Sequence, residues 1–264
     1  MPKLQVEGCY NFRDTGGLPL RDGGVTRPGI LYRSDALTNL TPTGLDELAH
    51  TAVGVIVDFR TPQEREAGPD RVPDSRPFKM VELPFLEGAM ADMTKQFMGS
   101  SSAPPTPEML SQAMSSIPPL SDLYIQILQH GASEFAQVAR LIAASSDTTP
   151  SAVLVHCTAG KDRTGVATAL MLEAAGAERR AIVADYASSQ QNLSGPWADG
   201  MLHMVSSMGV PLTPALKTLV TGTPREEIEK ALDWVDAHGG ITAYLRSGGL
   251  TDDELAGLRT RFVG

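Results

Sequence analysis

The sequence has few cysteines and less positive than negative charge, and both shortages exclude classes of protein. Among its 264 residues there are two cysteines, Cys9 and Cys157, too few for a disulfide framework, which points to a reducing compartment. Lysine and arginine number 22 against 31 aspartates and glutamates, for a net charge of -9. Without a basic stripe, a protein of this charge is not expected to bind nucleic acid.

Long apolar runs are missing as well. No run approaches the ~20 residues of a membrane span, and the N-terminus lacks the apolar core of a signal peptide. We therefore expect no integral membrane segment. The protein is expected in the cytoplasm, or outside it by a route that needs no signal peptide.

The sequence does contain an alternation of apolar runs and helical patterns. The runs at 53–61 and 151–157 are continuous, as expected of strands buried on both faces. Shorter runs at 29–35 and 80–85 indicate further strands, and helical periodicity fills the segments between and after the strands. The pattern predicts a single α/β domain with a mainly parallel central sheet flanked by helices, and additional C-terminal helices.

Loop and helix-start residues mark the remaining segments. The segment 86–120 is rich in serine and proline, so a long loop or a mobile insertion is expected there. Near the C-terminus, Thr223 with Glu226 and Thr251 with Glu254 match the capping box that opens a helix.

The motif HCTAGKDRTG at 156–165 combines residues whose side chains can react or bind an anion. It joins an apolar run to a helical pattern, so the loop amides and the helix N-terminus converge and form an anion site. Arg163 follows Cys157 by six positions, and a tight loop returns its guanidinium over the same anion, where it can hold two oxygens. The motif predicts a phosphate site beside a cysteine.

Cys157 is the expected nucleophile of that site. The positive field of the loop favours the thiolate, which is the reactive form, and a hydroxyl hydrogen bond from Thr164 would stabilise the sulfur as a leaving group. A lone cysteine is more often a buried structural residue, but that alternative leaves the neighbouring Gly, Lys, Asp, Arg and Thr unexplained. The pattern fits phosphoryl transfer to sulfur followed by hydrolysis of the phosphocysteine.

The motif resembles the active-site loop of the Cys-x5-Arg protein tyrosine phosphatases. Its Gly-Lys-Asp-Arg-Thr variant is similar to the bacterial group that includes mycobacterial protein tyrosine phosphatase B. The likeness extends to NFRDTGG, GILYRSDAL, VIVDFRT and DYASS, and so covers most of residues 8–190. It implies a tyrosine-phosphatase-like fold and hydrolysis of phosphotyrosine in proteins. We expect no metal or organic cofactor. The expected phosphate-binding residues are Thr158, Ala159, Gly160, Lys161, Arg163 and Thr164.

A phosphate monoester needs a general acid for the leaving oxygen, and two aspartates are candidates. The Trp-Pro-Asp loop of the eukaryotic enzymes does not occur in the sequence. Asp162 lies inside the phosphate loop, whereas Asp58 ends a strand that leads to the same sheet edge. The resemblance favours Asp162 as essential and Asp58 as acid or support. For both, a structural role as a loop-bracing carboxylate stays open.

Lys161 adds a second cation to the loop. Additional positive potential favours substrates with more than one phosphate, and phosphoinositide phosphatases often carry a lysine at this position. Phosphoinositides are therefore expected as additional substrates, beside phosphoserine and phosphothreonine. The alternative is a solvated loop lysine.

Residues outside the loop have weaker signals. Arg13 and Asp14 either brace the phosphate loop or close a turn. His156 is expected to orient the loop by hydrogen bonding rather than to act as a base, and Cys9 is expected to be an inert apolar filler.

Three methionines follow helical spacing within 190–222, at Met201, Met204 and Met208. They either pack in the core or belong to a lid over the active site, which the resemblance implies.

Two other functions stay open at this point. A non-catalytic phosphate-binding module would read a phosphorylated partner, but it would not need Cys157, Asp162 and Arg163 intact. A rhodanese-like sulfurtransferase also uses a loop cysteine, without requiring arginine at this spacing. A cysteine-dependent phosphatase that acts on a phosphorylated protein or a phosphoinositide accounts for all of these residues. Nothing in the sequence predicts an oligomeric state.

Overall fold

A five-stranded sheet forms the centre of the molecule, in the order β1-β2-β5-β3-β4. The computed structural model describes residues 5–84, 119–207, 209 and 211–263. The strands are β1 Arg13–Asp14, β2 Leu31–Ser34, β3 Val53–Asp58, β4 Lys79–Glu82 and β5 Ala152–His156. Only β1 pairs antiparallel to its neighbour, so the prediction of a mainly parallel sheet is confirmed, and the carboxyl ends of four strands share one edge.

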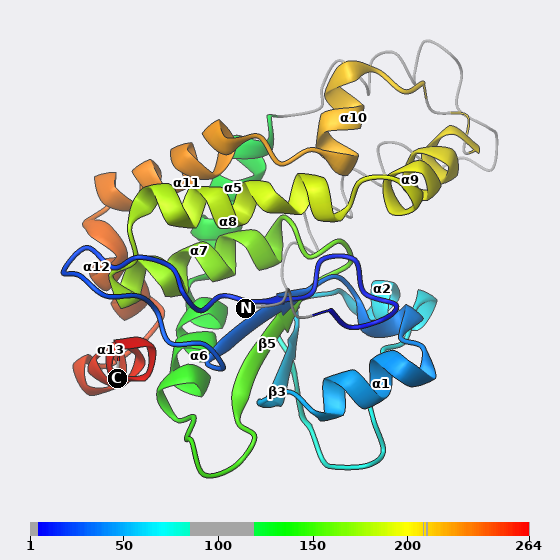
Figure 1. Cartoon of the computed structure of the whole chain (residues 1–264). Coiled ribbons are helices and arrows are strands. Elements are labelled where there is room, and N and C mark those ends of the chain that lie inside the picture. The colour runs from blue at the N-terminus through cyan, green and yellow to red at the C-terminus, as the bar shows by residue number, and fades with distance from the viewer. Residues whose placement is uncertain (1–4, 85–118, 208, 210, 264) are drawn as a thin grey trace.

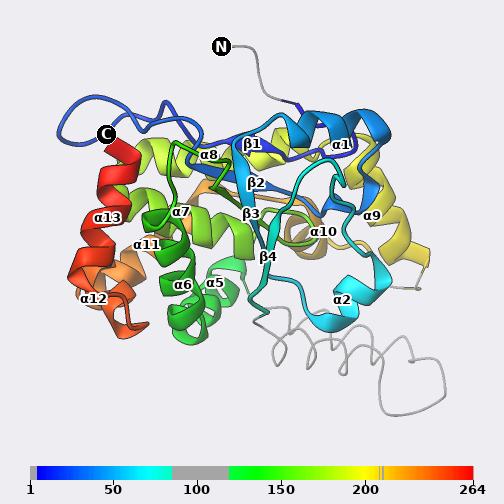
Figure 2. The ribbon, with the colours of Figure 1, turned by 90° about the horizontal axis from the view of Figure 1, so that it is seen from below.

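Helices cover both faces of this sheet (Figure 1). Those before β5 are α1 Pro42–Ala49, α2 Pro62–Ala67, α5 Leu120–His130 and α6 Ala132–Ala143, with a short 3-10 turn at Leu37–Asn39. Those after it are α7 Arg163–Ala175, α8 Arg179–Asn192, α9 Pro196–Ser207, α10 Pro214–Thr221, α11 Arg225–Ala237, α12 Gly240–Ser247 and α13 Asp252–Val263. In Figure 2 the strands lie between α5, α6 and α7 on one side and α1 and α2 on the other.

The central strand β5 shows why its sequence is a continuous apolar run. Val153 and Val155 join the larger core formed with α5 to α8 and α11 to α13, whereas Ala152 and Leu154 join a smaller core formed with α1 and the N-terminal segment. Alternate side chains thus enter opposite faces, and both faces are buried. The expected α/β architecture is confirmed.

One expected helical segment is divided. Helical periodicity runs through 121–145, but α5 ends before Gly131 and α6 begins after it. A Cβ atom at Gly131 would lie 2.7 Å from the Ile127 carbonyl oxygen and 2.9 Å from the Phe135 ring. The helical pattern therefore breaks where Gly131 lies so close to Ile127 and Phe135 that only glycine fits.

The two predicted capping boxes have different outcomes. Thr251 and Glu254 exchange the two expected hydrogen bonds at the start of α13. At α11 the prediction is wrong, because the Thr223 hydroxyl donates to the Ala187 carbonyl of α8 and its amide donates to Gln190. Tertiary contacts with α8 have replaced the local cap.

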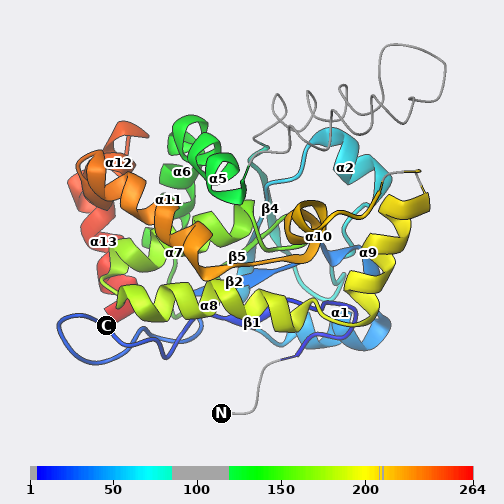
Figure 3. The ribbon, with the colours of Figure 1, turned by 90° about the horizontal axis from the view of Figure 1, so that it is seen from above.

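The segments predicted as an insertion and a lid differ in what can be described. Of 86–120, residues 86–118 lie outside the described residues. In 190–222, α9 and α10 lie at the opposite end of the molecule from α12 and α13 (Figures 1 and 3). The prediction of core packing is wrong for Met204, which is 49% exposed; Met208 lies outside the described residues.

Among the helices described, none has the length and apolarity to cross a membrane.

Candidate active site

The predicted phosphate loop lies at the carboxyl edge of the sheet. β5 ends at His156 between the ends of β2 and β3, and α7 begins at Arg163. Every residue of α7 is buried, so the helix that carries the loop is held on all sides. Cys157 is 2% and Arg163 7% exposed. The two residues therefore lie at a fixed turn rather than on an open surface loop.

Three consecutive carbonyl oxygens of the loop, those of residues 158–160, accept hydrogen bonds from outside the loop. The carbonyl of Thr158 accepts from the Ala36 amide at 3.1 Å, and those of Ala159 and Gly160 accept from the Asn11 side-chain amide at 3.2 and 3.0 Å. Within the described part of the chain, the N–H groups of residues 158–162 donate no hydrogen bond. The loop thus keeps its donors available for an anion.

Gly160 is needed for this arrangement. Its φ is +66°, and a Cβ atom there would lie 2.1 Å from the carbonyl oxygen of Ser34. The glycine lets the loop lie directly against the end of β2 with its carbonyl outward.

Two arginines and one carboxylate brace the loop from outside. Arg33 is 0% exposed and donates to the Gly160 carbonyl at 2.8 Å and to Asp185 of α8 at 2.7 Å. Arg13 donates to the other Asp185 oxygen at 2.8 Å. Burial raises the pKa of Asp185, but the two guanidiniums outweigh it and hold the pKa below its ordinary value. Burial, and then the charge of Arg13, lower the pKa of Arg33 to about 10.

These contacts separate two roles that the sequence leaves open. Arg13 braces the loop through Asp185, whereas the Asp14 carboxylate accepts from the amides of Gly16 and Gly29, both at 2.7 Å, and closes a turn. Asn11, Arg33 and Asp185 were not among the predicted site residues, although they lie in the stretches NFRDTGG, GILYRSDAL and DYASS that carry the resemblance.

Asn11→Asp is expected to lower kcat/KM for aryl phosphates about tenfold or more, because it loses a donor and places an oxygen against two carbonyls. The new carboxylate keeps the Oδ1 acceptor for Arg13; outside the loop, the donor to the Ser189 hydroxyl at 3.3 Å is lost as well. The exposed Asn39 offers a matched control, and Asn39→Asp should stay within about twofold. Steady-state kinetics and inhibition by inorganic phosphate provide the measurement; parental values for Asn11→Asp would show that the loop needs no such donor.

Arg163 is held in place by Glu64 of α2. Its Nη1 donates to Glu64 Oε2 at 2.8 Å and to the Phe59 carbonyl at 2.9 Å, and its Nη2 donates to Glu64 Oε1 at 2.6 Å. A guanidinium has five N–H donors, so the Nε–H and one Nη2–H remain. These two project from the same edge of the group and can bind two oxygens of one phosphate.

Besides binding Arg163, Glu64 makes structural hydrogen bonds within α2 and to the phosphate loop. It completes the capping box of α2 with Thr61, and Oε1 accepts from the Thr158 hydroxyl at 2.6 Å. Burial raises the pKa of Glu64, but Arg163 outweighs burial and lowers it to about 2; the same pair raises the pKa of Arg163 against the effect of its burial. The T-x-x-E pattern at 61–64 predicts a helix cap, not a site residue, so Glu64 was missed.

Asp58 reaches the sheet edge as predicted but faces a different partner. It is 2% exposed, and both of its oxygens accept from Arg60 at 2.8 to 3.1 Å. Arg60 Nη2 also lies 2.8 Å from Asp70. Between the roles of acid and support, this buried pairing favours support.

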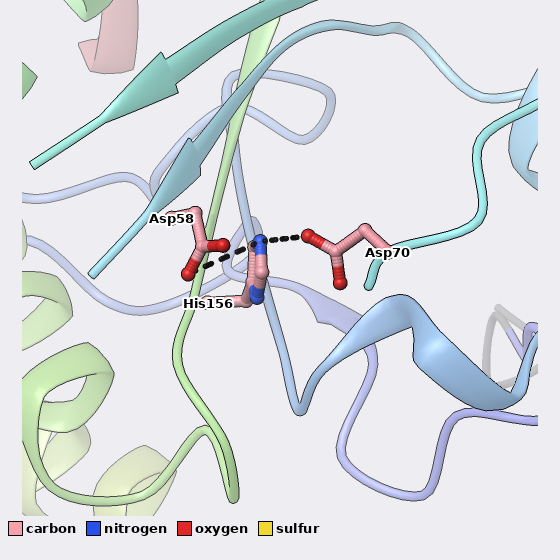
Figure 4. Close-up of side chains that lie close together, drawn as sticks. All are labelled: Asp58, Asp70 and His156. Atoms are coloured by element: carbon pink, nitrogen blue, oxygen red, sulfur yellow. Dashed lines mark ion pairs between the residues drawn. The ribbon is translucent and has the colours of Figure 1, made fainter. Parts of the chain in front are cut away.

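His156 lies beside the same carboxylates (Figure 4). Its Nε2 is 3.2 Å from Asp70 and 3.9 Å from Asp58. The three side chains could hold a metal ion, but the Arg60 guanidinium already binds both carboxylates and supplies the positive charge. Burial raises the pKa of Asp70, while His156 and Arg60 outweigh burial and lower it.

Lys161 and Asp162 form an ion pair at the start of α7, in which Lys161 is buried and Asp162 is partly exposed. Lys161 is 2% exposed, and its Nζ donates to Asp162 Oδ1 at 2.9 Å and to the carbonyls of Leu219 and Gly222, at the end of α10, at 2.9 and 3.2 Å. The alternative of a solvated lysine is therefore wrong. Asp162 Oδ1 also accepts from the Tyr124 hydroxyl at 2.7 Å; sequence alone gave no indication of Tyr124.

Two smaller predictions concern Thr164 and Cys9. The Thr164 hydroxyl is buried and has no hydrogen-bond partner among the described residues, so the predicted bond to the Cys157 sulfur is not formed. Cys9 packs against the smaller core, and burial, with Asp35, raises the pKa of its thiol. An un-ionised, packed thiol agrees with an apolar filler.

Comparison with known proteins gives one consistent result. The profile described as "Tyrosine phosphatase family" matches residues 4–264. The "Triple specificity protein phosphatase PtpB" of Mycobacterium tuberculosis is 28% identical over 285 aligned positions, which cover 100% of both chains. The "Tyrosine-protein phosphatase" of Nostoc commune is 30% identical over 234 positions, covering 87% of this chain and 72% of that protein.

Proposed function

This chain belongs to the tyrosine phosphatase family and is a phosphatase, and we propose that it hydrolyses phosphotyrosine in proteins through a phosphocysteine intermediate. The observation that carries the proposal is the loop at 157–163. The N–H groups of residues 158–162 donate no hydrogen bond within the described chain, and the carbonyls of Thr158, Ala159 and Gly160 are bound from outside. Among the described residues, the Nε–H and one Nη2–H of Arg163 have no partner.

In the first step, the Cys157 thiolate attacks phosphorus and the bond from phosphorus to the leaving oxygen breaks. The leaving oxygen takes a proton from Asp162, which is at the rim of the loop with its side chain 25% exposed. The loop amides and the free edge of Arg163 bind the phosphoryl oxygens, where negative charge is spread in the transition state.

In the second step, water attacks phosphorus, and the sulfur–phosphorus bond breaks. The water gives its proton to the Asp162 carboxylate, inorganic phosphate leaves, and the thiolate is regenerated. No electron is gained or lost, and the cycle consumes one water for each ester.

The proposal is tested by a direct comparison of substrates. The protein should hydrolyse p-nitrophenyl phosphate and a phosphotyrosine peptide, and it should not transfer sulfur from thiosulfate to cyanide. Sulfur transfer without phosphate release would support the rhodanese alternative, and binding of the phosphopeptide without turnover would support the non-catalytic module.

Phosphoserine, phosphothreonine and phosphoinositides form the wider substrate range that we propose, in line with the relative named for triple specificity. Lys161 is the residue that would serve an additional phosphate. All three of its ammonium donors have acceptors, two of them at the end of α10. A second phosphate would have to replace the Leu219 and Gly222 carbonyls.

Lys161→Ala is expected to lower kcat/KM for a phosphatidylinositol phosphate several-fold more than for a phosphotyrosine peptide, since only the former has extra charge to bind. Both substrates are measured at one ionic strength, because screening alters any charge effect. An equal fall in kcat/KM for both substrates would show that Lys161 serves only to bind Asp162 and α10. Absence of lipid hydrolysis by the parent would remove this substrate class.

The segment 190–222 is proposed as a lid over the loop. The support is its attachment: the last turn of α10 is hydrogen-bonded to Lys161, inside the phosphate loop, while no described residue of α9 is buried. A helix pair held mainly at one end is suited to moving when substrate binds.

A further inference from the structure

Two buried tyrosines lie behind the aspartate of the phosphate loop. Tyr124 of α5 donates its hydroxyl to Asp162 Oδ1 at 2.7 Å, and the Tyr186 hydroxyl of α8 lies 2.7 Å from that of Tyr124. The rings meet edge to face with centroids 6.0 Å apart, and the side chains are 0% and 1% exposed. Because Tyr124 gives its hydrogen to the carboxylate, its oxygen accepts from Tyr186. The three groups form one directed chain.

The two carboxylate oxygens of Asp162 therefore differ. Oδ1 accepts from Tyr124 and from Lys161, whereas Oδ2 has no hydrogen-bond partner within the described chain. A proton on Oδ1 would point at the hydrogens of two donors, so the neutral carboxyl carries its proton on Oδ2. When that proton leaves, the new charge is stabilised at Oδ1 by donors already in place.

We propose that Tyr124 is a positioning residue that fixes Oδ2 of Asp162 as the oxygen that protonates the leaving group, and that Tyr186 holds Tyr124 for this purpose. The inference rests on the proposed function, in which Asp162 is the general acid. Burial, followed by the charge of Asp162, raises the pKa of both tyrosines. Both hydroxyls therefore remain donors at any pH used for an assay.

The leaving group separates this role from a structural one. Tyr124→Phe removes one hydroxyl from the chain. We expect it to lower kcat for phenyl phosphate about tenfold, as for a lost hydrogen bond to a charged group. For p-nitrophenyl phosphate, whose leaving group needs little protonation, the loss should be below about twofold. Tyr186→Phe should shift the ratio of the two rates in the same direction by a smaller factor.

Tyr244 provides a matched control. Its buried hydroxyl donates to the Leu128 carbonyl at 2.6 Å, in a part of the core with no contact to the loop among the described hydrogen bonds. Tyr244→Phe removes the same group from the same kind of environment. It is expected to lower the melting temperature and to leave the ratio of the two rates unchanged.

A double mutant completes the test. Asp162→Asn should itself lower kcat for phenyl phosphate far more than for p-nitrophenyl phosphate, and adding Tyr124→Phe should change the ratio no further. Two results would overturn this inference and leave the proposed function in place. One is that the effects of the two substitutions on the ratio multiply. The other is that Tyr124→Phe lowers both rates equally while Asp162→Asn is selective. An equal loss on both substrates from Asp162→Asn would show that Asp162 is not the general acid, and Tyr124 would then have no acid to position. If Tyr124→Phe does not fold, an unchanged ratio in Tyr186→Phe overturns the inference.

Discussion

Cys157→Ser is expected to lower kcat for p-nitrophenyl phosphate by about a thousandfold or more, as loss of a covalent nucleophile does. A serine hydroxyl is barely ionised near neutral pH and is a far weaker nucleophile than a thiolate. Binding should survive, because the loop amides and Arg163 are untouched and the two side chains have similar shapes.

The chain contains its own control for this substitution. Cys9 is the other free cysteine, and Cys9→Ser makes the same atomic change outside the loop; its kcat should stay within about threefold of the parent, since such changes at a distance act only through stability. Steady-state kinetics and phosphopeptide binding by titration calorimetry are the measurements. Cys157→Ser activity within tenfold of the parent would rule out the cysteine as nucleophile.

Arg163→Lys is expected to lower kcat about a hundredfold or more although the charge is kept. An ammonium cannot contact Glu64 through two parallel bonds and also hold two phosphoryl oxygens with a second pair of donors. Near-normal kcat in this variant would mean that the residue acts only as a positive charge, and that the fork geometry is not needed.

Glu64→Gln tests the support of that fork. The amide keeps the size of the side chain but offers one acceptor where Arg163 now uses two oxygens, so kcat should fall about tenfold, less than for Arg163→Lys.

The pKa of Glu64 is lowered to about 2. The pair is thus fully present above about pH 4.5 and is lost only as the pH falls toward 2. A loss of activity between pH 7 and pH 5 cannot come from protonation of Glu64.

The proposed active-site loop could be identified from sequence because its parts are consecutive in the chain. A buried strand, a Gly-containing turn and a helix N-terminus occur within the stretch from Ala152 to Ala175. Local periodicity places the strand and the helix, and the motif between them specifies an anion site. The central sheet follows from the same local patterns.

The residues that shape the loop could not be found in this way, because their contacts are distant in sequence. Asn11 and Gly160 are 149 positions apart, Arg163 and Glu64 are 99 apart, and Tyr124 and Asp162 are 38 apart. Each of these side chains also has a bland local interpretation: a turn residue, a helix cap or a core aromatic. Only the fold shows that they meet at one loop.

The failed predictions have the same physical origin. Local pattern predicts a cap at Thr223 and leaves open an exposed ammonium at Lys161. In the fold, α8 takes the threonine hydroxyl and α10 takes the ammonium. The close approach of Gly131 to Ile127 and Phe135 likewise divides a segment whose periodicity is continuous. Tertiary contacts outweigh local preference where the two compete.

Trapping of the intermediate tests the central claim most directly. The protein is mixed with p-nitrophenyl phosphate, quenched in denaturant within one turnover, digested and analysed by mass spectrometry, with Cys157→Ser treated in parallel. We predict that the peptide containing Cys157 gains the mass of one phosphoryl group on sulfur, and that the variant gains none. Turnover of the parent with no label on Cys157, or with the label on another residue, would contradict the phosphocysteine mechanism.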